Sequence, residues 1–143
     1  MSLEKFNIPG DCEPGTNKGD VYGTFYVNWT DGQGRQKSSK ILSVARENSK
    51  KIQSGNDYAI NRHVDVERYY RGGKFEIKGE LKEMDEGLKG ADDQIGAWKF
   101  NLSRKAQGKQ TKRAHGSTCY PGNAKQPLMY YGLSRRDYIY PPE

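Results

Sequence analysis

The fold of this chain is decided by the stretch Lys74-Phe75-Glu76-Ile77-Lys78-Gly79-Glu80-Leu81-Lys82. Apolar and charged residues alternate through it without a break. Phe75, Ile77 and Leu81 share one face with Gly79, and lysines and glutamates form the other. This alternation is typical of an antiparallel strand with one buried face and one face in water. We therefore expect a core strand here, with the charged side chains exposed.

Strand patterns also occur before and after this stretch. Residues 21–29 alternate in the same way, with Tyr22 and Tyr26 on the polar face, and the Asp-Gly turn at 31–34 predicts a hairpin. Residues 58–70 and 96–102 continue the series, while residues 45–53 fit a short helical turn. We expect a mostly β fold, a small antiparallel barrel or sandwich of about five strands. Extended N- and C-terminal segments would flank it.

The expected organisation is a single domain with a segment on each side. A chain of 143 residues fits one domain. We expect an extended lead-in over 1–20, the antiparallel β domain over 21–103, and a basic, tyrosine-rich loop and docking tail over 104–143. The sequence contains no apolar run of membrane-span length and no apolar N-terminal stretch of signal-peptide length. This favours a cytoplasmic protein, or the mature form of a targeted one.

Two cysteines lie in the same local string, Cys-x-Pro-Gly. Cys12 and Cys119 each precede Pro-Gly turn chemistry and are expected in loops. They are either free thiols or the two halves of a disulfide that joins the ends of the fold. Two cysteines with only two histidines argue against a structural zinc site, and we expect no cofactor.

The net charge of +6 is concentrated in the C-terminal part of the chain. Between Asp93 and Asp137 there is no acidic residue, and that stretch holds nine lysines and arginines. Such a block creates a positive potential that attracts polyanions or acidic protein surfaces. Tyrosines are interleaved with the charges, and interfaces are enriched in tyrosine and arginine. A partner-binding surface is therefore expected here, the alternative being a loop that only keeps the protein soluble.

The candidate binding residues are the cations and tyrosines of this region. They are Arg104, Lys105, Lys109, Lys112, Arg113, Tyr120, Tyr130, Tyr131, Arg135, Arg136, Tyr138 and Tyr140. The cations would set the rate of encounter with an acidic partner, and the tyrosines would be the anchors. Residues 126–143 would form either a docking arm or a last edge strand of the domain.

No residue pattern carries a catalytic or metal-binding motif, and we expect no enzyme. His63 and Asp65 share a strand face, and His115 lies in the basic region. With outward carboxylates such as Glu76 and Glu80, these histidines supply the groups that a metal-free ribonuclease needs, though without a motif that fixes their geometry. A polar outer face explains His63 and Asp65 equally well.

Three functional hypotheses follow from these patterns. The first is a non-catalytic assembly protein, a structural subunit that docks onto an acidic protein surface of a larger complex through its basic, tyrosine-rich region. The second is a single-stranded nucleic-acid-binding domain of the OB type, in which Tyr22 and Tyr26 stack on bases and the lysines and arginines of 99–136 follow the phosphates. The third is the ribonuclease-like enzyme.

Overall fold

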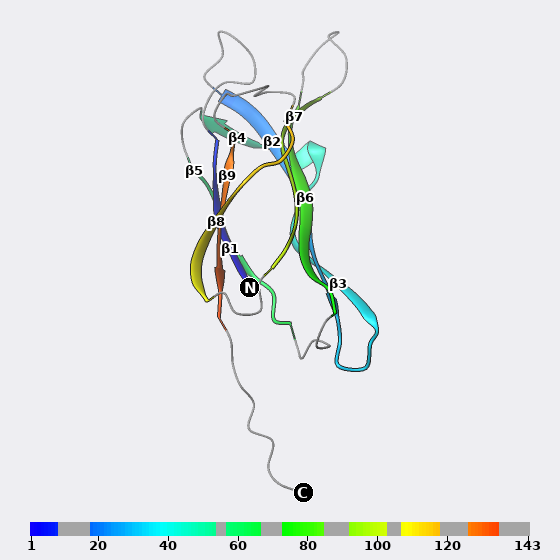
Figure 1. Cartoon of the computed structure of the whole chain (residues 1–143). Helices are drawn as coiled ribbons and strands as arrows, with labels where there is room; N and C mark the ends of the chain where they lie inside the picture. Colours follow the sequence, from blue (N-terminus) through cyan, green and yellow to red (C-terminus); the bar gives the residue numbers. More distant parts are fainter. Residues whose placement is uncertain are drawn as a thin grey trace, which may run out of the picture.

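The computed structural model describes residues 1–8, 18–53, 57–66, 73–84, 92–102, 107–117 and 126–134 (Figure 1). Within these residues there are nine strands and one short 3-10 helix, η1 (Arg46–Asn48). The strands are β1 (Ser2–Asn7), β2 (Lys18–Thr30), β3 (Gln36–Val44), β4 (Lys50–Gln53), β5 (Asp57–His63), β6 (Phe75–Glu83), β7 (Asp93–Asn101), β8 (Gly108–Arg113) and β9 (Leu128–Leu133).

The strands form two antiparallel sheets, visible as two layers in Figure 1. The smaller sheet has the order β5-β1-β9-β8, and the larger has the order β3-β2-β6-β7, with β4 also paired to β2. The mostly β, antiparallel fold class is confirmed. The expected number of about five strands is wrong, because nine are present in the described residues, and the two sheets do not close into a barrel.

The core lies between the sheets and is centred on three aromatic rings. Phe6 of β1 lies 5.1 Å from Phe25 of β2 and 5.1 Å from Trp98 of β7, measured between ring centroids. The alternating stretch forms β6, and its Ile77 and Leu81 are buried in the same core cluster, as the pattern predicts, whereas Phe75 is half-buried. Tilted rings at such distances interact favourably beyond the area that they bury.

Strands lie on both sides of the expected 21–103 range. In the segment expected as a lead-in, β1 forms a central strand of the smaller sheet, and β2 begins at Lys18. In the segment expected as a loop and tail, β8 and β9 form strands, and β9 pairs with both β1 and β8. The described part of residues 126–143, which is residues 126–134, therefore contains an interior strand of the fold. It is neither a docking arm nor an edge strand.

The chain passes from one sheet to the other just after β8. Residues 108–113 pair with β9 in the smaller sheet, whereas His115 and Gly116 bond to β7 of the larger one. The amide of Ala97 donates to the carbonyl of Gly116, and the amide of His115 donates to the carbonyl of Ala97, both at 2.9 Å. This crossing joins the sheets along one side and leaves β8 itself in the smaller sheet.

Two local expectations are corrected. Only Arg46–Asn48 of the expected helical turn is helical, and Lys50–Gln53 pairs with β2 as a strand. Glu76 was expected to face water, but the residue is only 7% exposed. The side-chain amide of Asn28 donates a hydrogen bond to the Glu76 carboxylate at 3.2 Å, and the Lys74 ammonium lies 3.8 Å from that carboxylate. The buried carboxylate of Glu76 is therefore paired. The described chain holds no helix long and apolar enough to span a membrane.

Candidate functional site

The structure describes five of the predicted binding residues. Lys109, Lys112 and Arg113 are exposed on β8, and Tyr130 is half-buried on β9. The others lie outside the described residues: Arg104, Lys105, Tyr120, Arg135, Arg136, Tyr138 and Tyr140. Cys12 and Cys119 also lie outside them, so the disulfide alternative stays a prediction.

The fifth predicted binding residue, Tyr131, is a core residue. It is 8% exposed, and its ring centroid lies 5.6 Å from that of Phe100 on the opposite sheet. Side chains on a strand alternate between faces, so Tyr131 points inward with Met129 and Leu133, whereas Tyr130 points outward. The expectation that Tyr131 anchors a partner is therefore corrected.

β8 is an edge strand whose outer side pairs with no described strand. The amide of Ala114 donates to the carbonyl of Pro127 at 3.0 Å, which sets the direction of the backbone groups. In an antiparallel ladder, every second residue directs its amide and carbonyl to the same neighbour. The backbone amide and carbonyl groups of Gln110 and Lys112 therefore point toward β9. Those of the alternate residues point toward the free edge; these residues are Lys109, Thr111 and Arg113. We call these three residues the free edge of β8.

The side chains of β8 are basic and mostly exposed. The strand holds Lys109, Lys112 and Arg113 and no acidic residue. The Lys112 ammonium lies 5.2 Å from the centre of the Phe100 ring, a favourable cation–π distance. The indole of Trp98 donates to the carbonyl of Lys112 at 2.9 Å. These contacts hold the edge strand against the opposite sheet.

A second basic feature crosses the outer face of the larger sheet. Strand pairing places Tyr26 of β2 beside Lys40 of β3 on one side and Lys78 of β6 on the other, and Lys78 beside Lys99 of β7. All four side chains are exposed, and Tyr26 is the exposed large apolar residue of the described chain, at 37%. We call these four residues the lysine–tyrosine row.

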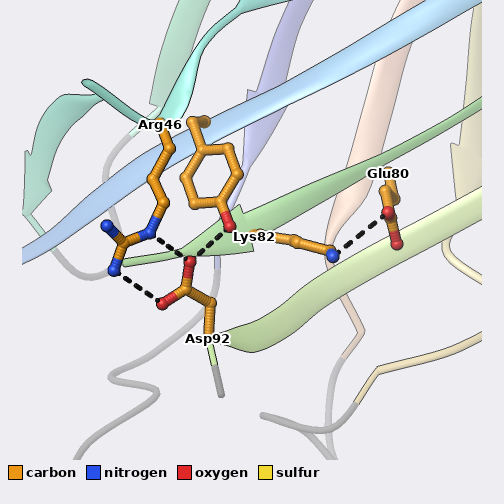
Figure 2. A network of polar contacts seen from close by, with 5 residues as sticks. Arg46, Glu80, Lys82 and Asp92 are labelled. Carbon is orange, nitrogen blue, oxygen red and sulfur yellow. Dashed lines mark hydrogen bonds and ion pairs between the residues drawn. The ribbon is translucent and has the colours of Figure 1, made fainter. Parts of the chain in front are cut away.

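The acidic side chains next to this row have partners of their own. The Glu80 carboxylate accepts a hydrogen bond from the side-chain amide of Gln94 at 2.8 Å. The same carboxylate lies 3.6 Å from the Lys82 ammonium, and Figure 2 shows this ion pair. Glu76 is held by Asn28 and Lys74, as described above. The lysines of the row, in contrast, have no ion pair with any described residue.

A polar network fixes Tyr22, the other outward tyrosine of β2. Its hydroxyl donates to Asp92 at 2.5 Å, and the Arg46 guanidinium donates to both oxygens of the same carboxylate, at 2.7 and 3.2 Å (Figure 2). Such two-pronged pairs fix orientation as well as contributing energy. The network joins η1 to the start of β7 across β2. Burial, and then the hydrogen bond to Asp92, raise the pKa of Tyr22 to about 12.

The raised pKa of Tyr22 makes a testable prediction. We expect its phenol to titrate near pH 12, and Asp92→Asn to lower that pKa, because the neighbouring negative charge is removed. A group whose pKa is raised by folding stabilises the fold fully below its unfolded pKa of about 10 and loses that contribution as pH rises through the folded value. Ultraviolet difference titration against Tyr22→Phe measures the shift, and an unchanged pKa in Asp92→Asn would contradict the assignment.

The two histidines lie apart in the fold. His63 ends β5, at one edge of the smaller sheet, and pairs with Ser2, whereas His115 follows β8 at the opposite edge. Glu76 and Glu80 stand on β6 of the other sheet. The described residues also contain no group of three or more His, Cys, Asp or Glu side chains able to hold a metal ion. The described strands thus place His63 and His115 apart, while the backbone of His115 bonds to Ala97, the register partner of Glu80.

The lysine–tyrosine row cannot be recognised from the sequence alone, although the alternation places Tyr26 on the outward face. The row joins residues far apart in the sequence, and only the strand register places them side by side. The available signal was the outward position of Lys78 in the alternating stretch. Comparisons of the chain with protein-family models, with curated protein sequences and with solved structures found no match.

Proposed function

We propose that this protein is a non-catalytic binding protein that docks onto an acidic partner through the free edge of β8. The partner would contribute an extended acidic segment that pairs with β8 as an additional strand. The observation that carries the proposal is an exposed strand whose outer backbone groups pair with no described strand and whose charged side chains are all basic. The basic C-terminal region thus remains the proposed binding element, with the edge strand in place of the expected arm.

The backbone of β8 supports addition of a strand. Lys109, Thr111 and Arg113 direct amide and carbonyl groups away from β9, and such a row is a template for another chain. His115 is the next residue whose backbone amide points away from β9, and this amide donates to the carbonyl of Ala97 in the other sheet. Recognition by strand addition takes its affinity from main-chain hydrogen bonds and its specificity from side chains.

The charge of β8 supports an acidic partner and opposes a second copy of this chain. If two copies of β8 paired antiparallel around Thr111, Lys109 of each copy would lie opposite Arg113 of the other. Like charges directly opposite each other destabilise a strand pair. An acidic segment would place opposite charges at the same positions. Edge lysines protect many sheets from aggregation, and that role alone would give no selective binding.

The test uses a synthetic acidic peptide of alternating glutamate and valine, with a lysine–valine peptide as the charge control. We expect the acidic peptide to bind and the basic peptide not to bind, and the binding to weaken with salt. Thr111→Pro removes one edge amide without changing charge, and edge strands tolerate proline. We expect it to reduce affinity at least tenfold, whereas Thr111→Ala, which keeps the amide, leaves affinity within about twofold.

Two results would overturn the proposal. One is that the folded protein binds neither peptide, or binds both equally. The other is that Thr111→Pro, shown to be folded by circular dichroism, binds the acidic peptide as well as Thr111→Ala does. Isothermal titration calorimetry gives the affinities.

A further inference from the structure

We propose that the outer face of the larger sheet binds single-stranded nucleic acid, with Tyr26 stacking on a base and Lys40, Lys78 and Lys99 holding phosphates. This site is separate from the free edge of β8, because it lies on the other sheet. It stands on a different observation, an exposed aromatic ring beside lysines that form no ion pair with the described residues.

The row depends on an irregularity in the pairing of β2 with β3. Phe25 pairs with Leu42, whereas the next residue, Tyr26, pairs with Lys40, so Ile41 is an extra residue on β3. Such a bulge changes the side chain that stands opposite a given position. Both Ile41 and Leu42 are buried, so the bulge adds an apolar residue to the core and brings a lysine beside Tyr26.

The ring of Tyr26 is partly accessible, since the residue is 37% exposed. Its neighbours on the same face of β2 are the smaller side chains of Thr24 and Asn28, and its hydroxyl has no hydrogen bond to a described residue. Tyr22 differs, because its hydroxyl is bound to Asp92 within a fixed network. Of the two outward tyrosines of β2, Tyr26 is therefore the one able to stack on a ligand.

On β6, the charged side chains on either side of Lys78 form ion pairs. Lys74 and Lys82 pair with Glu76 and Glu80, and these pairs contribute no net charge. The three lysines of the row remain, on strands that lie roughly 4.8 Å apart. Three cations in a line across a sheet, with an aromatic ring among them, suit a chain of phosphates with unpaired bases.

The aromatic ring favours a single strand over a duplex or an acidic protein. Bases in a duplex are already stacked, whereas an unpaired base can lie on an exposed ring. Binding to single strands combines a positive surface with aromatic platforms and depends little on sequence. Three phosphate contacts imply a slope of about −2 for the logarithm of the association constant against the logarithm of salt concentration.

The test compares two probes, a labelled oligothymidylate of about 12 nucleotides and a linear polyphosphate that carries charge but no bases. We expect Tyr26→Ala to weaken oligothymidylate binding at least fivefold, since a stacked base contributes at least this factor, and to leave polyphosphate binding within twofold. Lys78→Gln with Lys99→Gln should make the salt slope about 1.4 less steep. The charge-matched control is Lys109→Gln with Arg113→Gln, on the other sheet, for which we expect a smaller change of slope.

The outcomes separate this site from the proposed β8 site. If wild-type protein fails to bind the oligothymidylate, or if Tyr26→Ala changes binding of both probes equally or of neither, the nucleic-acid site is refuted. Tyr26→Ala is expected to leave binding of the glutamate–valine peptide unchanged, so either proposal can fail while the other holds. Because the Tyr26 side chain is on the surface, we expect Tyr26→Ala to stay folded. Chemical denaturation of the variant checks this.

Discussion

Replacing Trp98 with alanine is expected to lower the free energy of unfolding by about 3–5 kcal/mol, the usual cost of removing a buried large aromatic side chain. Trp98 is 1% exposed, and its ring packs against those of Phe6 and Phe25, with centroids 5.1 and 5.6 Å away. These rings come from both sheets, so the cavity left by alanine would lie where the sheets meet. Chemical denaturation measures the loss.

The control is Trp98→Phe, which keeps an aromatic ring but removes the indole donor. That donor bonds the carbonyl of Lys112 on the opposite sheet at 2.9 Å. A hydrogen bond of this kind contributes about 1 kcal/mol, and the smaller ring adds a further loss. We expect the free energy of unfolding of Trp98→Phe to lie between those of the wild type and Trp98→Ala. A loss below about 1 kcal/mol in Trp98→Ala would show that the sheets are held together elsewhere.

The larger sheet could be predicted from the sequence because its central strands obey a simple alternation. β6 and the part of β2 that pairs with it each turn one face to the core and the other outward, so apolar residues recur with period two, although Glu76 on the outward face is itself buried. Even here a bulge beside Leu81 disturbs the pattern. Ile95 and Gly96 are neighbours in the sequence and both are buried. An alternation alone would have placed one of them outside.

The smaller sheet was predicted only in part: β5 overlaps the strand expected over 58–70, whereas β1 and β8 do not show that pattern. In β1 the buried residues Leu3 and Phe6 are three positions apart, since a bulge between Leu3 and Lys5 shifts the register. β8 has no large apolar side chain because it is an exposed edge. In β9, by contrast, most residues are apolar or aromatic on both faces. Which residues of these strands are buried depends on the neighbouring strands in the sheet.

Some features of the two candidate sites could be predicted from the sequence, and others could not. The basic character of Lys109, Lys112 and Arg113 could be read from the sequence, since charge does not depend on the fold. Which backbone groups face outward on β8 could not, because that depends on the pairing of Ala114 with Pro127. The lysine–tyrosine row was still less predictable, because it requires three strand pairings and the bulge at Ile41. Composition identifies a binding surface, and register determines its geometry.

Replacing Gly23 with alanine is expected to cost about 3 kcal/mol or more, at the upper end of the range for overpacking. Gly23 is a buried residue of β2 that pairs with Val44 on one side and Leu81 on the other. A methyl group there would lie 2.1 Å from the carbonyl oxygen of Glu80 and 3.1 Å from the Cα of Leu81. Both atoms belong to the backbone of β6, so no side-chain rotation can relieve the clash.

The matched control is Gly116→Ala, at the point where the chain crosses between the sheets. A methyl group at Gly116 would meet its nearest atom, Oε1 of Gln94, at an ordinary contact distance of 3.7 Å. We expect that variant to stay within about 0.5 kcal/mol of wild type. Chemical denaturation of both variants gives the comparison, with circular dichroism to show whether Gly23→Ala folds at all. Equal stabilities would mean that β2 and β6 do not approach as closely as the structure has them. The lysine–tyrosine row, which depends on the same pairing of Tyr26 with Lys78, would then lose its geometric basis.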